Sequence, residues 1–69
     1  MATLSNEVRA FIVQGLAKFQ TPQEVAIDVK NIYGVEVTRQ HVESHDPTKA
    51  AGLNLAKKYK DLFFEYREQ

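Results

Sequence analysis

Apolar residues recur at steps of three and four along most of the chain, the spacing that places side chains on one face of an α-helix. The pattern predicts four helical segments: one that begins near Ser5, one over 22–33, one from Arg39 to about His45, and one from about Asn54 to the end. No repeat, low-complexity tract or linker interrupts them. We therefore expect an all-α fold, a small four-helix domain over residues 1–69.

The first two segments begin with capping signals. Ser5 is a suitable N-cap, and Glu7 lies in the first turn, where the helix dipole favours an acid. Thr21 and Glu24 have the spacing of a capping box, with Pro22 between them at N1. The expected buried stripes are Val8, Phe11, Ile12, Leu16 and Phe19 in the first helix and Val25, Ala26, Val29, Ile32 and Tyr33 in the second.

The second half of the chain is divided by turn residues. Gly34 suits a left-handed C′ position, and the alternation of Val35-Glu36-Val37 predicts a short extended link. Thr38 is expected to cap the third helix and Val42 to be its main inward residue. Asp46-Pro47 should stop this helix, and Gly52 should mark a break or bend. The last helix is expected to bury Leu55, Tyr59, Leu62, Phe63 and Tyr66, with Phe64 on its opposite side.

The middle of the chain has the organisation of a helix-turn-helix unit. A helix, a glycine-bearing turn and a short capped helix make this motif, whose second helix enters the DNA major groove. The link after Gly34 is two residues longer than in the tightest forms. Short helical hairpins also occur in proteins that bind no DNA, so the motif is moderately specific.

If this unit binds double-stranded DNA, the outward positions of the third helix read the bases. Arginine pairs with guanine and glutamine with adenine, whereas a glutamate repels phosphate unless a cytosine donates to it. Lysines after Pro47 would neutralise phosphates and release counterions. The predicted DNA contacts are Thr38, Arg39, Gln40, Glu43, Ser44, Lys49, Lys57 and Lys58. The alternative is that these residues form an ordinary solvated surface.

A second hypothesis assigns the domain a protein partner. At 100° per residue, Phe64 lies opposite the buried face of the last helix and is expected to be exposed. Aromatic side chains are frequent anchors of protein interfaces. The predicted partner-binding residues are Tyr59, Phe64 and Tyr66. The partner could be another protein or a second copy of the chain in a homo-oligomer.

Composition narrows the function classes. Nine basic residues balance nine acidic ones, so DNA binding would depend on local charge. The chain has no cysteine, and we expect His41 and His45 to be surface or half-buried residues, so no metal site is predicted. No triad, phosphate loop or membrane span is evident. We expect no catalytic residue, no cofactor, no small-molecule substrate and no membrane association. The absence of cysteine is consistent with folding in a reducing cytoplasm.

Several stretches of the sequence resemble a small phage and prophage family known only as a domain of unknown function. They include Ala2-Thr3-Leu4-Ser5, Phe11-Ile12-Val13-Gln14, 35–40 with 42–44, 46–52, and Leu55-Ala56-Lys57-Lys58. Some members look like the DNA-recognition part of phage terminase small subunits, which implies a phage helix-turn-helix protein. Members often continue past this length, so the chain is either a truncated recognition domain or a stand-alone small phage protein. The latter class includes host-takeover proteins that inhibit bacterial regulators such as quorum-sensing activators. The resemblance therefore implies the cytoplasm of a bacterial host cell as the location and a host bacterial protein as the alternative partner.

Overall fold

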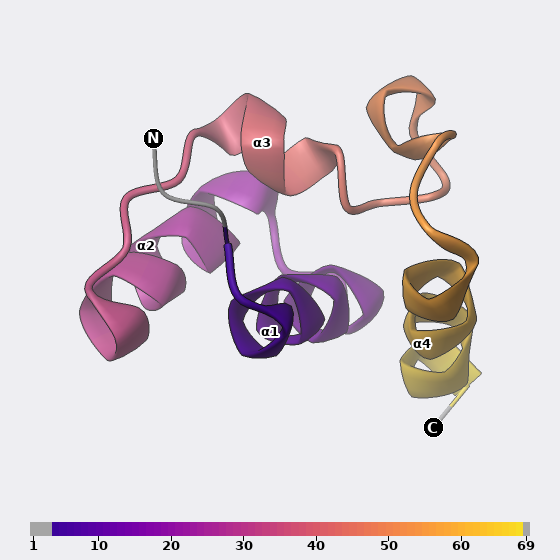
Figure 1. Ribbon diagram of the computed structural model, residues 1–69, viewed down its shortest axis with the longest axis horizontal. Coiled ribbons are helices and arrows are strands. Elements are labelled where there is room, and N and C mark those ends of the chain that lie inside the picture. Colours follow the sequence, from indigo (N-terminus) through magenta and orange to yellow (C-terminus); the bar gives the residue numbers. More distant parts are fainter. Residues whose placement is uncertain (1–3, 69) are drawn as a thin grey trace.

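Helix α1 lies at the centre of the fold, with α2 against one side and α4 against the other (Figure 1). The computed structural model describes residues 4–68. Its elements are α1 (Asn6–Ala17), α2 (Pro22–Tyr33), α3 (Arg39–Glu43), the short 3₁₀ helix η1 (Ala50–Gly52) and α4 (Lys57–Glu68). Residues 4–68 contain no strand. The expected all-α domain of four helices is confirmed.

The start of α1 is confirmed, but its apolar stripe is shorter than the sequence suggests. Ser5 is the N-cap, and its Oγ accepts from the backbone N–H of Val8 at 3.2 Å. The helix ends at Ala17, and Phe19 has a φ of 70° and a side chain that is 74% exposed. The expectation that Phe19 is buried is wrong, because the helical period does not continue through the turn.

Helix α2 has the predicted bounds and both predicted ends. The N–H of Glu24 donates to Thr21 Oγ1 at 3.1 Å, and the N–H of Thr21 donates to the Glu24 carboxylate at 2.9 Å. These reciprocal bonds satisfy two amide groups that a helix start leaves unpaired. Gly34 ends the helix in the left-handed conformation, with a φ of 69°.

The buried face of α2 is confirmed only in part. Val25 and Val29 are fully buried, and Ala26 and Tyr33 are partly buried against the core. Ile32 is 61% exposed, so its predicted burial is wrong. The periodic stripe therefore extends beyond the part of α2 that the neighbouring helices cover.

A single core fills the space between these helices. Its largest fully buried side chain is Phe63 of α4, and Tyr33 of α2 packs edge-on against Phe11 of α1, with 5.5 Å between ring centroids. The buried apolar residues are Val8, Ile12, Val13, Leu16, Ala17, Val25, Val29, Val42, Leu55, Tyr59 and Phe63. Burial of this set away from water supplies the main stabilising free energy.

The segment between α3 and α4 is less helical than its sequence pattern predicts. Helix α3 ends at Glu43 rather than His45, and α4 begins at Lys57 rather than near Asn54. Leu55 is buried, but it reaches the core from the turn before α4. The side chain of Asp46 accepts from the N–H and the hydroxyl of Thr48, which holds the chain in a turn. The apolar spacing of the last segment therefore included Leu55, a buried residue that lies outside any helix.

Arg67 ties the end of α4 to the end of α1. Its guanidinium donates to the carbonyl oxygens of Leu16 at 3.2 Å and Ala17 at 3.3 Å. The same group lies over the rings of Phe19 and Phe63, at 4.1 and 4.4 Å from their centroids. The Leu16 carbonyl also accepts from the backbone N–H of Phe19 at 3.0 Å, so the arginine adds to the turn that ends α1 as a cap supplied by a distant helix.

Candidate functional site

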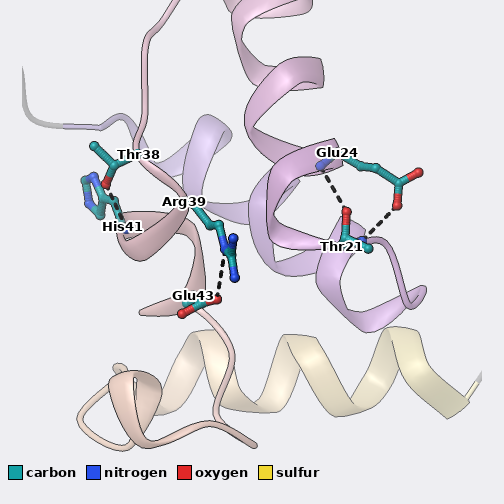
Figure 2. A network of polar contacts seen from close by, with 6 residues as sticks. All are labelled: Thr21, Glu24, Thr38, Arg39, His41 and Glu43. Atoms are coloured by element: carbon teal, nitrogen blue, oxygen red, sulfur yellow. Dashed lines mark hydrogen bonds and ion pairs between the residues drawn. The ribbon is translucent and has the colours of Figure 1, made fainter.

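Helix α3 is held in place at its first turn and by one apolar side chain. Thr38 Oγ1 accepts from the backbone N–H of His41 at 3.0 Å (Figure 2). Val42 is fully buried, and α3 packs against α2. The predicted cap and the predicted inward residue are both confirmed. Arg39, Gln40 and His41 are consequently left on the solvent side of the helix.

The polar residues of α3 differ in how far they are available to a partner. Arg39 Nε lies 3.6 Å from the Glu43 carboxylate, one turn away (Figure 2). The hydroxyl of Ser44 donates to the carbonyl oxygen of His41. Glu43 and Ser44 are half-buried, whereas Gln40 is exposed. The Arg39 side chain is 73% exposed, and an ion pair with so exposed a partner contributes little to stability, so Arg39 can leave Glu43 for a ligand.

The three predicted phosphate-binding lysines are exposed but lie outside α3. Lys49 precedes η1, which contacts α3, and Lys57 and Lys58 begin α4. Lys57 lies 3.4 Å from the Asp61 carboxylate. The Lys58 ammonium lies 5.0 Å from the centroid of the Tyr59 ring. The predicted DNA contacts are therefore spread over three segments.

The three predicted aromatic anchors have different environments. Phe64 is exposed, as expected, and Tyr66 is half-buried against the core. Tyr59 is only 3% exposed, and its hydroxyl donates to Asn6 Oδ1 at 2.9 Å. A role for Tyr59 as a surface anchor is therefore wrong, because the ring belongs to the core.

A groove between α2 and the chain leading into α3 was not predicted from the sequence. We define the α2–α3 groove by its lining residues: Gln23, Ala26, Ile27, Lys30, Asn31, Glu36, Val37, Thr38 and Arg39. Its volume is about 610 Å³, and Ile27 within it is 52% exposed. The signal for Ile27 was present in the sequence, since 100° steps place it roughly opposite Val25 and Val29 on α2.

An ion pair crosses one edge of the α2–α3 groove. The Lys30 ammonium lies 2.8 Å from the Glu36 carboxylate. The hydrogen bond and charge of Lys30 lower the pKa of Glu36 below its ordinary value. Lys30 and Glu36 therefore offer a mixed pair of charges beside the apolar floor formed by Ile27 and Val37.

A second unpredicted feature is the Arg9–His45 pair, which joins α1 to the end of α3. Arg9 Nε donates to His45 Nε2 at 3.3 Å, and His45 Nδ1 donates to the carbonyl oxygen of His41 at 2.9 Å. The Arg9 guanidinium also lies 4.5 Å from the centroid of the Tyr59 ring. No sequence signal indicated this pairing, because Arg9 and His45 are 36 residues apart.

His45 is buried, which corrects the expectation that it is a surface or half-buried residue. Burial lowers the pKa of His45 below its ordinary value, and the charge of Arg9 acts in the same direction, while the bond to the His41 carbonyl opposes it. His45 therefore favours the neutral form, which can accept from Arg9 and donate to His41 at once.

Two kinds of feature are missing from the described residues, a metal-binding cluster and a membrane-spanning helix. Within 4–68, no three His, Cys, Asp or Glu side chains come together in a way that could hold a metal ion. No helix in the same range combines the length and the apolar character that crossing a membrane requires. The candidate functional features of the domain are the α2–α3 groove, the exposed face of α3 and the Arg9–His45 pair.

Comparison with known proteins places the chain in a family. No curated protein and no solved structure matches it. The model of one family, described as "Uncharacterized conserved protein (DUF2280)", matches residues 1–69, the whole chain. The protein therefore belongs to the DUF2280 family of uncharacterized conserved proteins.

Proposed function

We propose that this domain binds a protein, and that the α2–α3 groove is the centre of its contact surface. The observation that carries the proposal is the exposure of Ile27 in a groove beside Arg39. A large apolar side chain in a concave surface gains by burial against a partner, and arginine is frequent among the residues that dominate binding energy. The resemblance to phage proteins makes a bacterial regulator the class of partner to test.

The charge distribution supports a protein partner over a nucleic acid. The chain has no net charge, and Lys30, Arg39 and Lys57 each lie within 4 Å of an acid. Proteins that bind duplex DNA use cations that neutralise successive phosphates. Acids beside these cations would repel the phosphate backbone, whereas mixed charges are common at the rim of a protein interface.

DNA binding is the second candidate, and one observation favours it. Helix α2, the turn at Gly34 and the Thr38-capped α3 follow one another as in a helix-turn-helix, and Arg39 and Gln40 are exposed on α3. With only five residues, α3 offers a short surface to a major groove. This brevity and the paired cations place DNA second.

Two exposed isoleucines of α2 give a matched test of the protein-binding proposal. Capture from bacterial lysate, with nuclease present, is compared for wild type, Ile27→Ala and Ile32→Ala. Ile27 lines the groove and Ile32 does not, although both side chains are more than half exposed. We expect Ile27→Ala to weaken binding of the captured protein about tenfold and Ile32→Ala to leave it unchanged. An equal loss of affinity in the two variants would show that the groove is not part of the interface.

The DNA candidate is tested with the same purified domain. If α3 reads bases, Arg39→Ala removes sequence preference, and Lys49→Ala and Lys58→Ala weaken binding to all sequences alike and flatten its salt dependence. Absence of salt-dependent duplex binding at low ionic strength would eliminate this candidate, since phosphate attraction is strongest there.

A further inference from the structure

The Arg9–His45 pair borders a second recess, which shares Glu36, Val37 and Thr38 with the α2–α3 groove. It lies between the start of α1, the link after α2 and α3, and its volume is about 820 Å³. We define the Arg9 recess by its lining residues: Leu4, Arg9, Gly34, Val35, Glu36, Val37, Thr38, His41, Ser44 and His45. Arg9 is a half-buried cation at this recess.

Arg9 has no acid partner within the described chain. Among residues 4–68, its recorded partners are His45, through Nε, and the ring of Tyr59. The recess includes one acid, Glu36, whose carboxylate is bound to Lys30. The two Nη groups of Arg9 form no hydrogen bond to any residue of 4–68, and they are the donors that grip a carboxylate bidentately.

The surroundings of Arg9 fix its orientation before any ligand arrives. The bond from Nε to His45 and the Tyr59 ring at 4.5 Å hold the guanidinium at two of its sides. His45 is itself held by the His41 carbonyl, so it is a positioning residue for Arg9. A donor group that is already oriented loses little conformational entropy when it binds.

We infer that the Arg9 recess receives a carboxylate, presented by an aspartate or glutamate of the protein partner. This inference rests on the proposed protein-binding function. One cation matches one carboxylate, and Leu4, Val35 and Val37 supply apolar walls for the side chain that carries it. A nucleic acid would bring successive phosphates past Glu36, which a single arginine does not offset. His41 is exposed at the same recess and can donate a second hydrogen bond.

Propionate, which has the length of a glutamate side chain, is a direct probe of the recess. Its neutral isostere propionamide and inorganic phosphate are titrated in parallel at constant ionic strength, and ¹H–¹⁵N NMR follows the Arg9 side chain and the backbone of 38–45. We expect saturable shifts with propionate and a dissociation constant in the millimolar range, as for a fragment of a few atoms. Equal shifts with propionamide, no saturable shift, or tighter binding of phosphate than of propionate would each overturn the inference.

Variants connect the probe to the named residues. Arg9→Gln should weaken propionate binding at least tenfold, and His41→Ala should weaken it several-fold without removing the backbone carbonyl that holds His45. Lys18→Gln removes an exposed charge from the end of α1 outside the recess and should change binding less than twofold. Circular dichroism checks that each variant is folded. If Arg9→Gln is unfolded, His41→Ala decides the matter, and unchanged binding in that variant would refute the assignment.

Capture experiments with the same variants distinguish failure of the carboxylate site from failure of the protein-binding function. Loss of capture in both Ile27→Ala and Arg9→Gln supports the two together. Loss in Ile27→Ala with full capture by Arg9→Gln and His41→Ala would overturn the carboxylate site and leave the protein-binding function standing. Saturable propionate binding with no captured protein would overturn the protein-binding function and leave only the affinity of the recess for a carboxylate.

Discussion

The carbonyl oxygen of Asp46 lies where a β-carbon on Gly52 would have to be placed. The backbone of Asp46 is part of the turn that ends α3, and Gly52 closes η1, so the two turns pack with no room for a side chain. This close approach is the steric reason why position 52 requires glycine.

Gly52→Ala should therefore destabilise the domain on the order of 3 kcal/mol, because backbone rather than a flexible side chain must move. Urea denaturation measures this change. Ala51→Gly, an exposed neighbouring position, serves as the control and should change stability by less than about 1 kcal/mol. Wild-type stability in Gly52→Ala would mean that the two turns are not packed as described.

Gly34 should respond to substitution through its backbone conformation. It has a φ of 69°, and a β-carbon there would meet no atom within 4 Å. Gly34→Val should cost about 1–2 kcal/mol more than Gly34→Asn, since asparagine tolerates the left-handed region and a β-branched residue does not. Thermal unfolding of the two variants measures the difference. Equal melting temperatures would argue against a left-handed end to α2.

Val42→Ala should destabilise the domain by about 1–3 kcal/mol, because it removes two fully buried methyl groups between α3 and the core. In a domain of this size, each kcal/mol lowers the melting temperature by about 4–8 °C. Gln40→Ala, in the same helix but exposed, should change stability by less than about 0.5 kcal/mol. A melting temperature unaffected by Val42→Ala would place the residue outside the core.

Arg67→Lys should destabilise the domain by about 1–2 kcal/mol, although it preserves the charge. Lysine cannot bind the carbonyls of Leu16 and Ala17 with a planar fork while it covers the rings of Phe19 and Phe63. Urea denaturation tests this against Lys57→Arg, an exposed exchange of the same two residue types. A similar loss of unfolding free energy in both variants would show that Arg67 does not stabilise the domain as a cap.

Stability should fall as the solution is acidified below about pH 6.5, the ordinary pKa of histidine. Because burial lowers the pKa of His45 in the folded protein, the unfolded chain takes up a proton first, and the free energy of unfolding then decreases by up to about 1.4 kcal/mol per pH unit. The decrease ends once the folded form is protonated as well. Groups that face His45 include Arg9 of α1 and His41 of α3.

Melting curves between pH 7.5 and 5 test this expectation. His45→Gln keeps an acceptor for Arg9 but does not titrate, so the pH dependence of its melting temperature should be weaker than that of wild type. His41→Ala removes the exposed ring and should retain most of the wild-type dependence. Identical pH profiles in wild type and His45→Gln would remove His45 as the cause.

The sequence alone determined where α1, α2 and α3 begin. Ser5, Thr21 and Thr38 each accept a hydrogen bond from an amide three residues later, as their residue types and spacing predicted. Capping is local, so a short stretch of sequence contains both partners. The exposure of Arg39 and Gln40 was also predicted, because a buried Val42 and a 100° step place them toward solvent. Glu43 and Ser44 were expected to face outward as well, but they are half-buried.

Only the tertiary structure decided which apolar residues are covered and which polar residues meet. Phe19 and Ile32 continue apolar stripes but are exposed, since burial depends on where a neighbouring helix lies. Arg9 meets His45 across 36 residues, and Tyr59 meets Asn6 across 53. Helical periodicity orients each side chain about its own axis, but it does not specify the packing of one helix on another, and that packing creates the Arg9 recess.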